Sequence, residues 1–141
     1  MRLHLKHEWN VSTAEARKIQ EELREKWVGE DRLGEIRTVA GLDAAFVLTG
    51  SQGLKEMRSR WQALREANRA IAAVVVYRYP EMEELERTYA EVRLEFPYVP
   101  GFLSFREIPA LLAALSKLQT IPDLLFCDGQ GYAHPRRMGL A

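Results

Sequence analysis

Three acidic residues stand where the surrounding sequence predicts burial or near-burial. Asp43 interrupts the apolar run 36–47, and Asp128 ends the shorter apolar run 122–128. Glu107 opens a helical stretch directly after a loop that contains two prolines. A buried carboxylate without a partner is strongly destabilising, so each of these groups requires a hydrogen-bonding partner or a metal ion.

The carboxylates form one cluster if the two aspartate strands are adjacent and parallel, because both side chains then emerge at the same end of the sheet. Glu107 would complete an oxygen-rich site of the kind that binds Mg²⁺ or Mn²⁺. Such sites activate water and stabilise the leaving oxygen during phosphodiester cleavage. Spacing alone also allows an ordinary interpretation: Asp43 in a turn, Glu107 as a charge at a helix N-terminus, and Asp128 in an Asp-Gly turn.

Helices are predicted at three places around these residues. Ser12 and Glu15 form the pattern of a capping box, which predicts a helix from Thr13 to Val28 that ends near Gly29. Apolar residues at helical spacing, with charges on the other face, predict a second helix over 51–69. The third is predicted over 105–118.

Strands are predicted over 36–47, 71–77, 88–96 and 122–128. The run 71–77 is the strongest of these, since it is rich in β-branched residues. Within the acidic stretch 81–95, helix propensity and strand pattern conflict. The alternation of Val92, Leu94 and Phe96 favours a strand that starts at about Thr88.

Composition restricts the class of protein. The chain has 141 residues, 47% of them hydrophobic and 28% charged, which predicts one folded domain over 1–141 and argues against wholesale disorder. Twenty basic residues balance twenty acidic ones, so any phosphate binding must come from local patches. The single cysteine allows no internal disulfide, and no run of about 18 apolar residues occurs. These features predict a cytoplasmic protein without a membrane partner.

Three segments, 39–43, 96–107 and 127–137, resemble in order and rough spacing the signature blocks of the bacterial endonuclease V family. Members of that family are magnesium-dependent nucleases that nick DNA beside deaminated purines. The resemblance extends over about 8–141, except for 51–69.

The resemblance implies specific roles for matching residues. Asp43, Glu107 and Asp128 would be the metal-binding catalytic carboxylates. The loop residues Pro97, Tyr98, Val99 and Pro100 would be a wedge pushed into the duplex at the lesion, although such a loop taken alone is more often a structural turn. The pocket for the flipped base and the phosphate contacts would come from Gly129, Gln130, Gly131, His134 and Arg136.

The resemblance also implies a fold and an activity. The fold would be an α/β, ribonuclease H-like mixed β-sheet flanked by helices, with two hairpin strands on one side of the Asp43 strand and the Asp128 strand on the other. The activity would be DNA repair, by nicking on the 3′ side of deoxyinosine and other deaminated bases with metal-activated water. The cofactor would be Mg²⁺, with Mn²⁺ as an alternative.

Two departures from the family pattern shape these expectations. The stretch 51–69 is longer and more helical than the connection expected there, which predicts an inserted helix. The chain also ends where the family continues into a further strand and helices that carry a lysine and a histidine or aspartate. We therefore expect an incomplete fold, with about four of five core strands, and a dimer through the exposed sheet edge, an unstable chain or a piece of a longer protein. The alternatives are a truncated, catalytically inactive remnant or DNA-binding partial domain, and a nuclease that prefers inosine in RNA.

Overall fold

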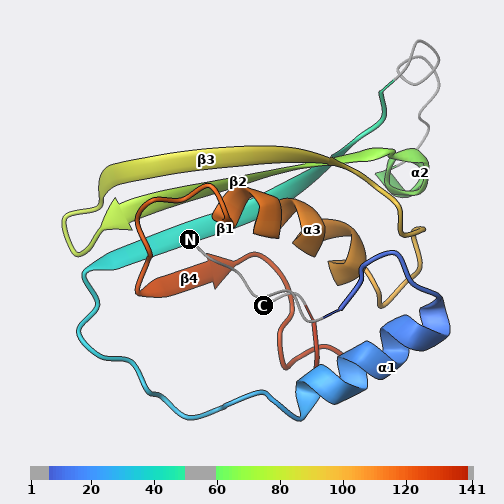
Figure 1. Ribbon diagram of the computed structural model, residues 1–141, viewed down its shortest axis with the longest axis horizontal. Coiled ribbons are helices and arrows are strands. Elements are labelled where there is room, and N and C mark those ends of the chain that lie inside the picture. Colours follow the sequence, from blue (N-terminus) through green and yellow to red (C-terminus); the bar gives the residue numbers. More distant parts are fainter. Residues whose placement is uncertain (1–6, 50–59, 140–141) are drawn as a thin grey trace.

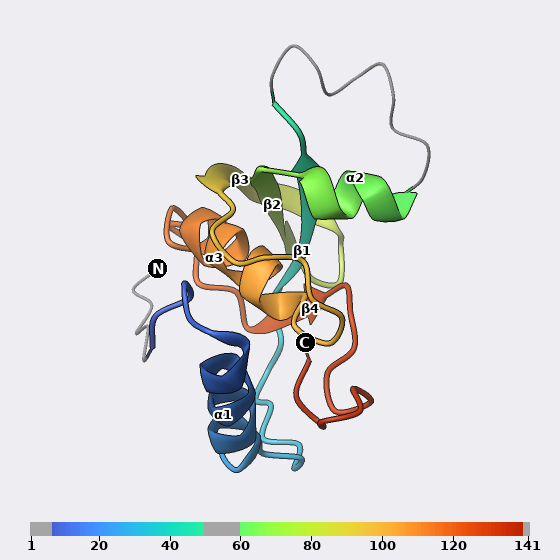
Figure 2. The ribbon, with the colours of Figure 1, turned by 90° about the vertical axis from the view of Figure 1, so that its right-hand side faces the viewer.

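The fold is a four-stranded mixed sheet with helices around it. The computed structural model describes residues 7–49 and 60–139, with side chains described for all of these except 60 and 61. The elements are α1 (Thr13–Arg24), β1 (Thr38–Val47), α2 (Arg60–Glu66), β2 (Arg69–Arg78), β3 (Glu83–Arg93), α3 (Ser104–Leu115) and β4 (Leu124–Cys127). Figure 1 shows α3 lying across the sheet, whereas α1 stands away from it (Figure 2).

The strand order is β3-β2-β1-β4, with antiparallel pairs β3/β2 and β2/β1 and a parallel pair β1/β4. This arrangement confirms the predicted order, including the placement of the two aspartate strands side by side. It decides the site, because parallel neighbours deliver their carboxyl ends to the same edge of the sheet.

The main core lies between the sheet and α3. Every second residue of β2 from Ala70 to Val76 is buried, and each of these side chains is alanine or valine. They pack against apolar residues of α3 and against Leu118, which follows the helix. Small residues on the sheet allow the helix backbone to come close, so this packing fixes the distance of α3 from the strands.

A second core joins α1 to the loop before α3. Ala16 and Ile19 of α1 pack against the buried rings of Phe96, Phe102 and Phe105. Ser12 caps α1, since its hydroxyl oxygen accepts a hydrogen bond from the Glu15 amide at 3.2 Å, as the capping box predicts. This cluster holds the ends of the 97–101 loop while leaving its prolines exposed.

The predicted start of β3 at Thr88 was wrong: the strand begins at Glu83 and ends at Arg93. Antiparallel pairing with β2 extends to the tip of the hairpin, where Arg78 pairs with Glu83. All of the glutamates except the half-buried Glu86 lie on exposed positions, and Arg78 and Arg87 each form an ion pair with one of them. Cross-strand pairing therefore overrides the helix propensity of this acidic segment.

The predicted end of α1 at Val28 was also wrong, because the helix ends at Arg24. The Lys26 and Trp27 amides donate to carbonyls three residues back, which tightens and closes the last turn. Trp27 and Val28 are about half exposed, at 54% and 52%, so their side chains gain little burial that would stabilise a longer helix.

The helix predicted over 51–69 is only partly tested. Residues 51–59 lie outside the described ranges, α2 occupies Arg60–Glu66, and β2 already begins at Arg69. Smaller shifts occur at the other ends: β1 begins at Thr38, β4 is restricted to Leu124–Cys127, and α3 ends at Leu115. Within the described ranges, no helix combines the length and apolar character needed to cross a membrane.

Candidate active site

The aspartates Asp43 and Asp128 stand at the same end of the parallel pair β1/β4. The last paired positions of the two strands are Leu42 and Cys127, and each aspartate comes directly after one of them. Neighbouring strands lie about 4.8 Å apart. The chain thus brings together two carboxylates that are 85 positions apart in the sequence.

Glu107 reaches this end of the sheet from the first turn of α3. All three carboxylates line one cavity of about 880 Å³. The other walls come from β1, α2, the loop before α3, the start of α3 and the loop after β4, through the following residues: Ala44, Ala45, Phe46, Ala63, Leu64, Gly101, Leu103, Ser104, Gly129, Gln130, His134, Pro135 and Gly139. The described part of the segment taken as an insertion therefore contributes a wall of the cavity.

The electrostatics of the cavity depend on how close these three groups are. The pKa of Glu107 is raised from its ordinary value of 4.5 to about 7, chiefly by burial and in addition by the negative charges of Asp43 and Asp128. The Asp43 carboxylate accepts a hydrogen bond from the Ala44 amide at 2.7 Å, and both aspartates are exposed to solvent at the cavity mouth. The cavity is a region of concentrated negative charge.

A cation fits this charge pattern. Among the described residues that line the cavity there is no lysine or arginine, so a phosphate would meet negative charge without compensation. Carboxylate oxygens are the donors that Mg²⁺ and Mn²⁺ prefer. Within the described ranges, no three His, Cys, Asp or Glu side chains already converge as a finished metal cage. The donor chemistry and the mutual repulsion fit a divalent cation, which would draw the three groups together.

The loop Pro97–Pro100 ends beside this cavity, since Gly101 lines it. Pro97 and Pro100 are exposed, whereas Tyr98 and Val99 are half-buried, and Val99 packs on the second core. Gly101 has a φ of +83°, a conformation that side-chain-bearing residues rarely adopt. Val99 thus anchors the loop on the second core, and the two rigid prolines face the solvent.

Arg106 is a residue that sequence reasoning did not single out. It is 3% exposed, its guanidinium donates to the Ala67 carbonyl at 3.1 Å, and its Nε has no partner among the described residues. The guanidinium carbon lies 5.2 Å from the Phe46 ring centre and 6.0 Å from that of Tyr98. The arginine therefore supports the Tyr98 ring from within. Its signal in the sequence is a basic residue next to Phe105 in a helix that, apart from Ser104 and Glu107, is apolar.

The loop after β4 divides into cavity wall and anchor. Gly129, Gln130 and His134 line the cavity, whereas Gly131 and Arg136 do not. Burial lowers the pKa of His134, and the nearby Arg136 lowers it further, which favours a neutral ring at neutral pH. The His134 Nδ1 atom accepts a hydrogen bond from the Arg136 amide at 3.1 Å.

Arg136 ties three segments together instead of facing the cavity. Its Nε donates to the Gln20 side chain at 2.7 Å, another guanidinium nitrogen donates to the Gly101 carbonyl, and its guanidinium carbon lies 4.3 Å from the Phe102 ring centre. Gln20, buried in α1, also donates to the Gly101 and Met138 carbonyls at 3.3 Å each. These contacts hold the loop after β4 against α1 and the proline loop.

Comparison with known proteins identifies a family that this chain resembles over most of its length. A sequence model of the endonuclease V family matches residues 21–141. An endonuclease V of Roseiflexus castenholzii is 45% identical over 135 residues, which make up 96% of this chain and 52% of the relative. The chain thus spans about half the length of the curated relatives it matches.

Solved structures agree in fold. Endonuclease V from Streptomyces avermitilis superposes with a TM-score of 0.74 at 37% identity, over 94% of this chain and 51% of that one. A Ciona intestinalis endonuclease V in complex with a 23mer DNA, containing an inosine followed by a ribo-adenosine, superposes with a TM-score of 0.67 at 30% identity, over 90% and 49%. The mixed sheet flanked by helices is therefore ribonuclease H-like, as predicted.

Proposed function

Since the chain belongs to the endonuclease V family, we propose that its carboxylate cavity cleaves a phosphodiester of DNA on the 3′ side of deoxyinosine and other deaminated bases. One observation carries the proposal. Asp43, Glu107 and Asp128 line a single cavity and lie close enough for the two aspartates to raise the pKa of the glutamate. Charge clustering of this kind costs stability, and cleavage of a phosphodiester is a function that uses it.

The three carboxylates would hold Mg²⁺, with Mn²⁺ as an alternative. A bound divalent cation would supply positive charge that lowers the pKa of water and stabilises the leaving oxygen. Asp43 lies within β1 and Asp128 directly follows β4, whereas Glu107 is carried by a helix that packs on the sheet, so the donors come from separate rigid elements. This rigidity keeps the donor positions nearly constant when a substrate arrives.

The proline loop would act as the wedge at the lesion. Pro97 and Pro100 are exposed on a loop whose ends are buried, so insertion into a duplex would cost little conformational entropy. Tyr98 would fill the space that a displaced base leaves. The backbone groups of Gly129, Gln130 and Gly131 would contact the displaced base, beside the His134 ring that lines the cavity. Arg136 would hold this loop in place.

A nicking assay tests the proposal. A duplex with one deoxyinosine is incubated with the chain in Mg²⁺, Mn²⁺ or EDTA, beside the variant Asp43→Ala and a control variant at the exposed residue Asp31. Cation-dependent nicking on the 3′ side of deoxyinosine is expected for the chain and for Asp31→Ala, and it is expected to be lost in Asp43→Ala. Folded protein that leaves the duplex intact in both metals contradicts the proposal.

Two alternative functions can be distinguished by further measurements added to this assay. Binding without cleavage is kept open because the chain spans about half of its relatives, and a gel shift without nicking would favour it. A preference for inosine in RNA is the other candidate, and the Ciona complex carries a ribo-adenosine after its inosine. Faster cleavage of an inosine-containing RNA strand than of DNA would favour RNA, since the 2′-hydroxyl is the group that distinguishes them.

A further inference from the structure

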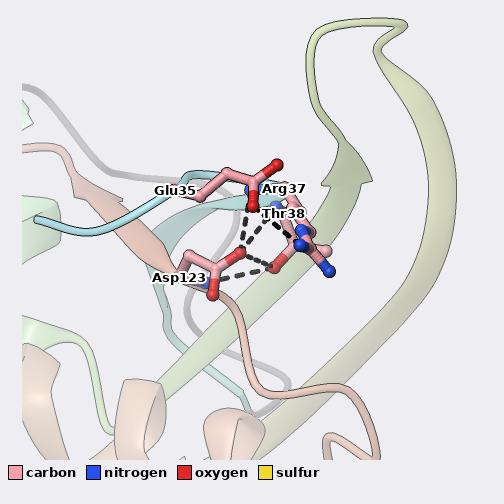
Figure 3. Close-up of polar contacts among 4 residues, drawn as sticks. All are labelled: Glu35, Arg37, Thr38 and Asp123. Atoms are coloured by element: carbon pink, nitrogen blue, oxygen red, sulfur yellow. Dashed lines mark hydrogen bonds and ion pairs between the residues drawn. The ribbon is translucent and has the colours of Figure 1, made fainter.

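A carboxylate clamp joins β1 and β4 at the end opposite the cavity (Figure 3). One oxygen of Asp123 accepts three hydrogen bonds: from the Arg37 amide at 3.0 Å, from the Thr38 amide at 2.9 Å and from the Thr38 hydroxyl at 3.0 Å. In return, the Asp123 amide donates to the Thr38 carbonyl and hydroxyl oxygens, both at 3.1 Å. The two residues are therefore bonded in both directions.

The surroundings of the clamp keep Asp123 charged and directed at the backbone. Hydrogen bonds from Arg37 and Thr38 lower the pKa of Asp123, so it is ionised at neutral pH and accepts strongly. The Arg37 side chain forms its own ion pair with Glu35 at 2.7 Å. The Asp123 oxygen is therefore hydrogen-bonded by the two backbone amides and the Thr38 hydroxyl, while the Arg37 guanidinium is paired with Glu35.

The clamp and the cavity are linked by the register of the strand pair. Thr38 lies five positions before Asp43, and Asp123 lies five positions before Asp128. The pairs that the structure records between them run from Val39–Leu124 to Leu42–Cys127 without interruption. A slip of one residue would turn the Asp128 side chain to the other face of the sheet.

β4 needs such a restraint more than the other strands do. It has four residues, and within the described ranges it pairs only with β1. At the cavity end, the two aspartates repel one another, which favours separation of the strands. A short edge strand with repulsion at one end is held in register by what binds its other end.

We propose that Asp123 is a positioning residue that, through its bonds to Arg37 and Thr38, holds Asp43 and Asp128 side by side as ligands of one divalent cation. The inference rests on the proposed function for the identity of the ligands. It assigns to Asp123 a role that its distance from the cavity would not suggest.

The test uses Mn²⁺ as the probe and two readouts on the full chain. Mn²⁺ affinity is measured by electron paramagnetic resonance, and the register is followed by cross-strand nuclear Overhauser effects between Leu42 and Cys127. The variants are Asp123→Ala, which removes all three acceptor bonds, and Asp123→Asn, which keeps one acceptor oxygen. The matched control is Glu86→Ala, because Glu86 also accepts from two loop amides, those of Gln119 and Thr120, at 2.9 Å each.

Asp123→Ala is expected to weaken Mn²⁺ binding about tenfold or more, as loss of a group that orients a ligand does. The Leu42–Cys127 effects are expected to weaken in that variant. Asp123→Asn is expected to stay close to the original chain in both readouts, as is Glu86→Ala.

Three other results would bear on the positioning role of Asp123 or on the cation site. Mn²⁺ binding and cross-strand effects that persist in Asp123→Ala would overturn the inference, and so would an equal loss in Glu86→Ala. If the original chain binds no Mn²⁺, the cation site of the proposed function fails. The cross-strand effects in Asp123→Ala then decide the positioning role by themselves: their loss supports it, and their persistence overturns it.

Discussion

At the scale of single residues, Glu107 illustrates how a site keeps an unfavourable charge. Its carboxyl group is mostly withdrawn from water and faces two aspartates, so the pKa is about 7 in the folded chain against 4.5 ordinarily. The folded state therefore holds this proton more tightly than the unfolded state does. The resulting contribution to stability is complete below about pH 4.5 and is lost as the pH rises through about 7.

The variant Glu107→Gln should consequently stabilise the cation-free protein at pH 8 and have little effect at pH 4. The expected gain is on the order of 1–2 kcal/mol, because solvent at the cavity mouth screens part of the repulsion. Thermal unfolding in EDTA at the two pH values measures it. A control variant, Glu95→Gln, changes an exposed carboxylate and should show no such pH dependence. A lower melting temperature for Glu107→Gln at pH 8 would refute the argument.

At the scale of elements, the proline loop depends on a single glycine at its end. Gly101 has a φ of +83°, and a Cβ added there would lie 2.7 Å from a guanidinium nitrogen of Arg136. That nitrogen already donates to the Gly101 carbonyl. A side chain at this position would both strain the backbone and displace the arginine that anchors the loop after β4.

Gly101→Ala should therefore destabilise the chain by about 1–3 kcal/mol and weaken binding to a deoxyinosine duplex. Urea denaturation and a fluorescence binding titration measure the two effects. Gly34→Ala is the matched control, because nothing lies within 4 Å of a Cβ built there. If both variants are equally stable, the close approach of Arg136 does not constrain the loop.

At the scale of the whole molecule, the described sheet leaves β4 at an edge. Leu125 and Phe126 of this strand are 40% and 59% exposed. An edge strand with unpaired backbone groups and exposed apolar side chains is a template for pairing with another chain. The balanced net charge of the sequence adds little repulsion between copies.

We expect sedimentation equilibrium to show concentration-dependent dimers that Phe126→Lys weakens, since a lysine opposes edge-to-edge pairing. Tyr89→Lys is the control, because Tyr89 is a more exposed aromatic residue, at 72%, on β3 at the opposite edge. A monomer at all concentrations would contradict the expectation, and so would equal weakening by both variants.

The sequence by itself predicted the types and order of the described elements and singled out the three carboxylates that the structure places around one cavity. The β-branched residues in 71–77, the capping residues at 12–15 and the prolines at 97 and 100 act over a few neighbouring residues, so local patterns report them. Asp43, Glu107 and Asp128 each lie in a signature block, and the order and spacing of these blocks can be read directly along the sequence. These features needed no knowledge of long-range contacts.

Only the tertiary structure decided which residues face the cavity and which hold it together. His134 lines the cavity while Arg136, two residues later, is bound to Gln20 and Gly101. β3 starts at Glu83 because β2 lies beside it, and the Asp123 carboxylate accepts hydrogen bonds from Thr38, which lies 85 positions earlier in the sequence. Each outcome depends on groups distant in sequence, since pairing energies and burial are properties of the assembled fold that no local pattern encodes.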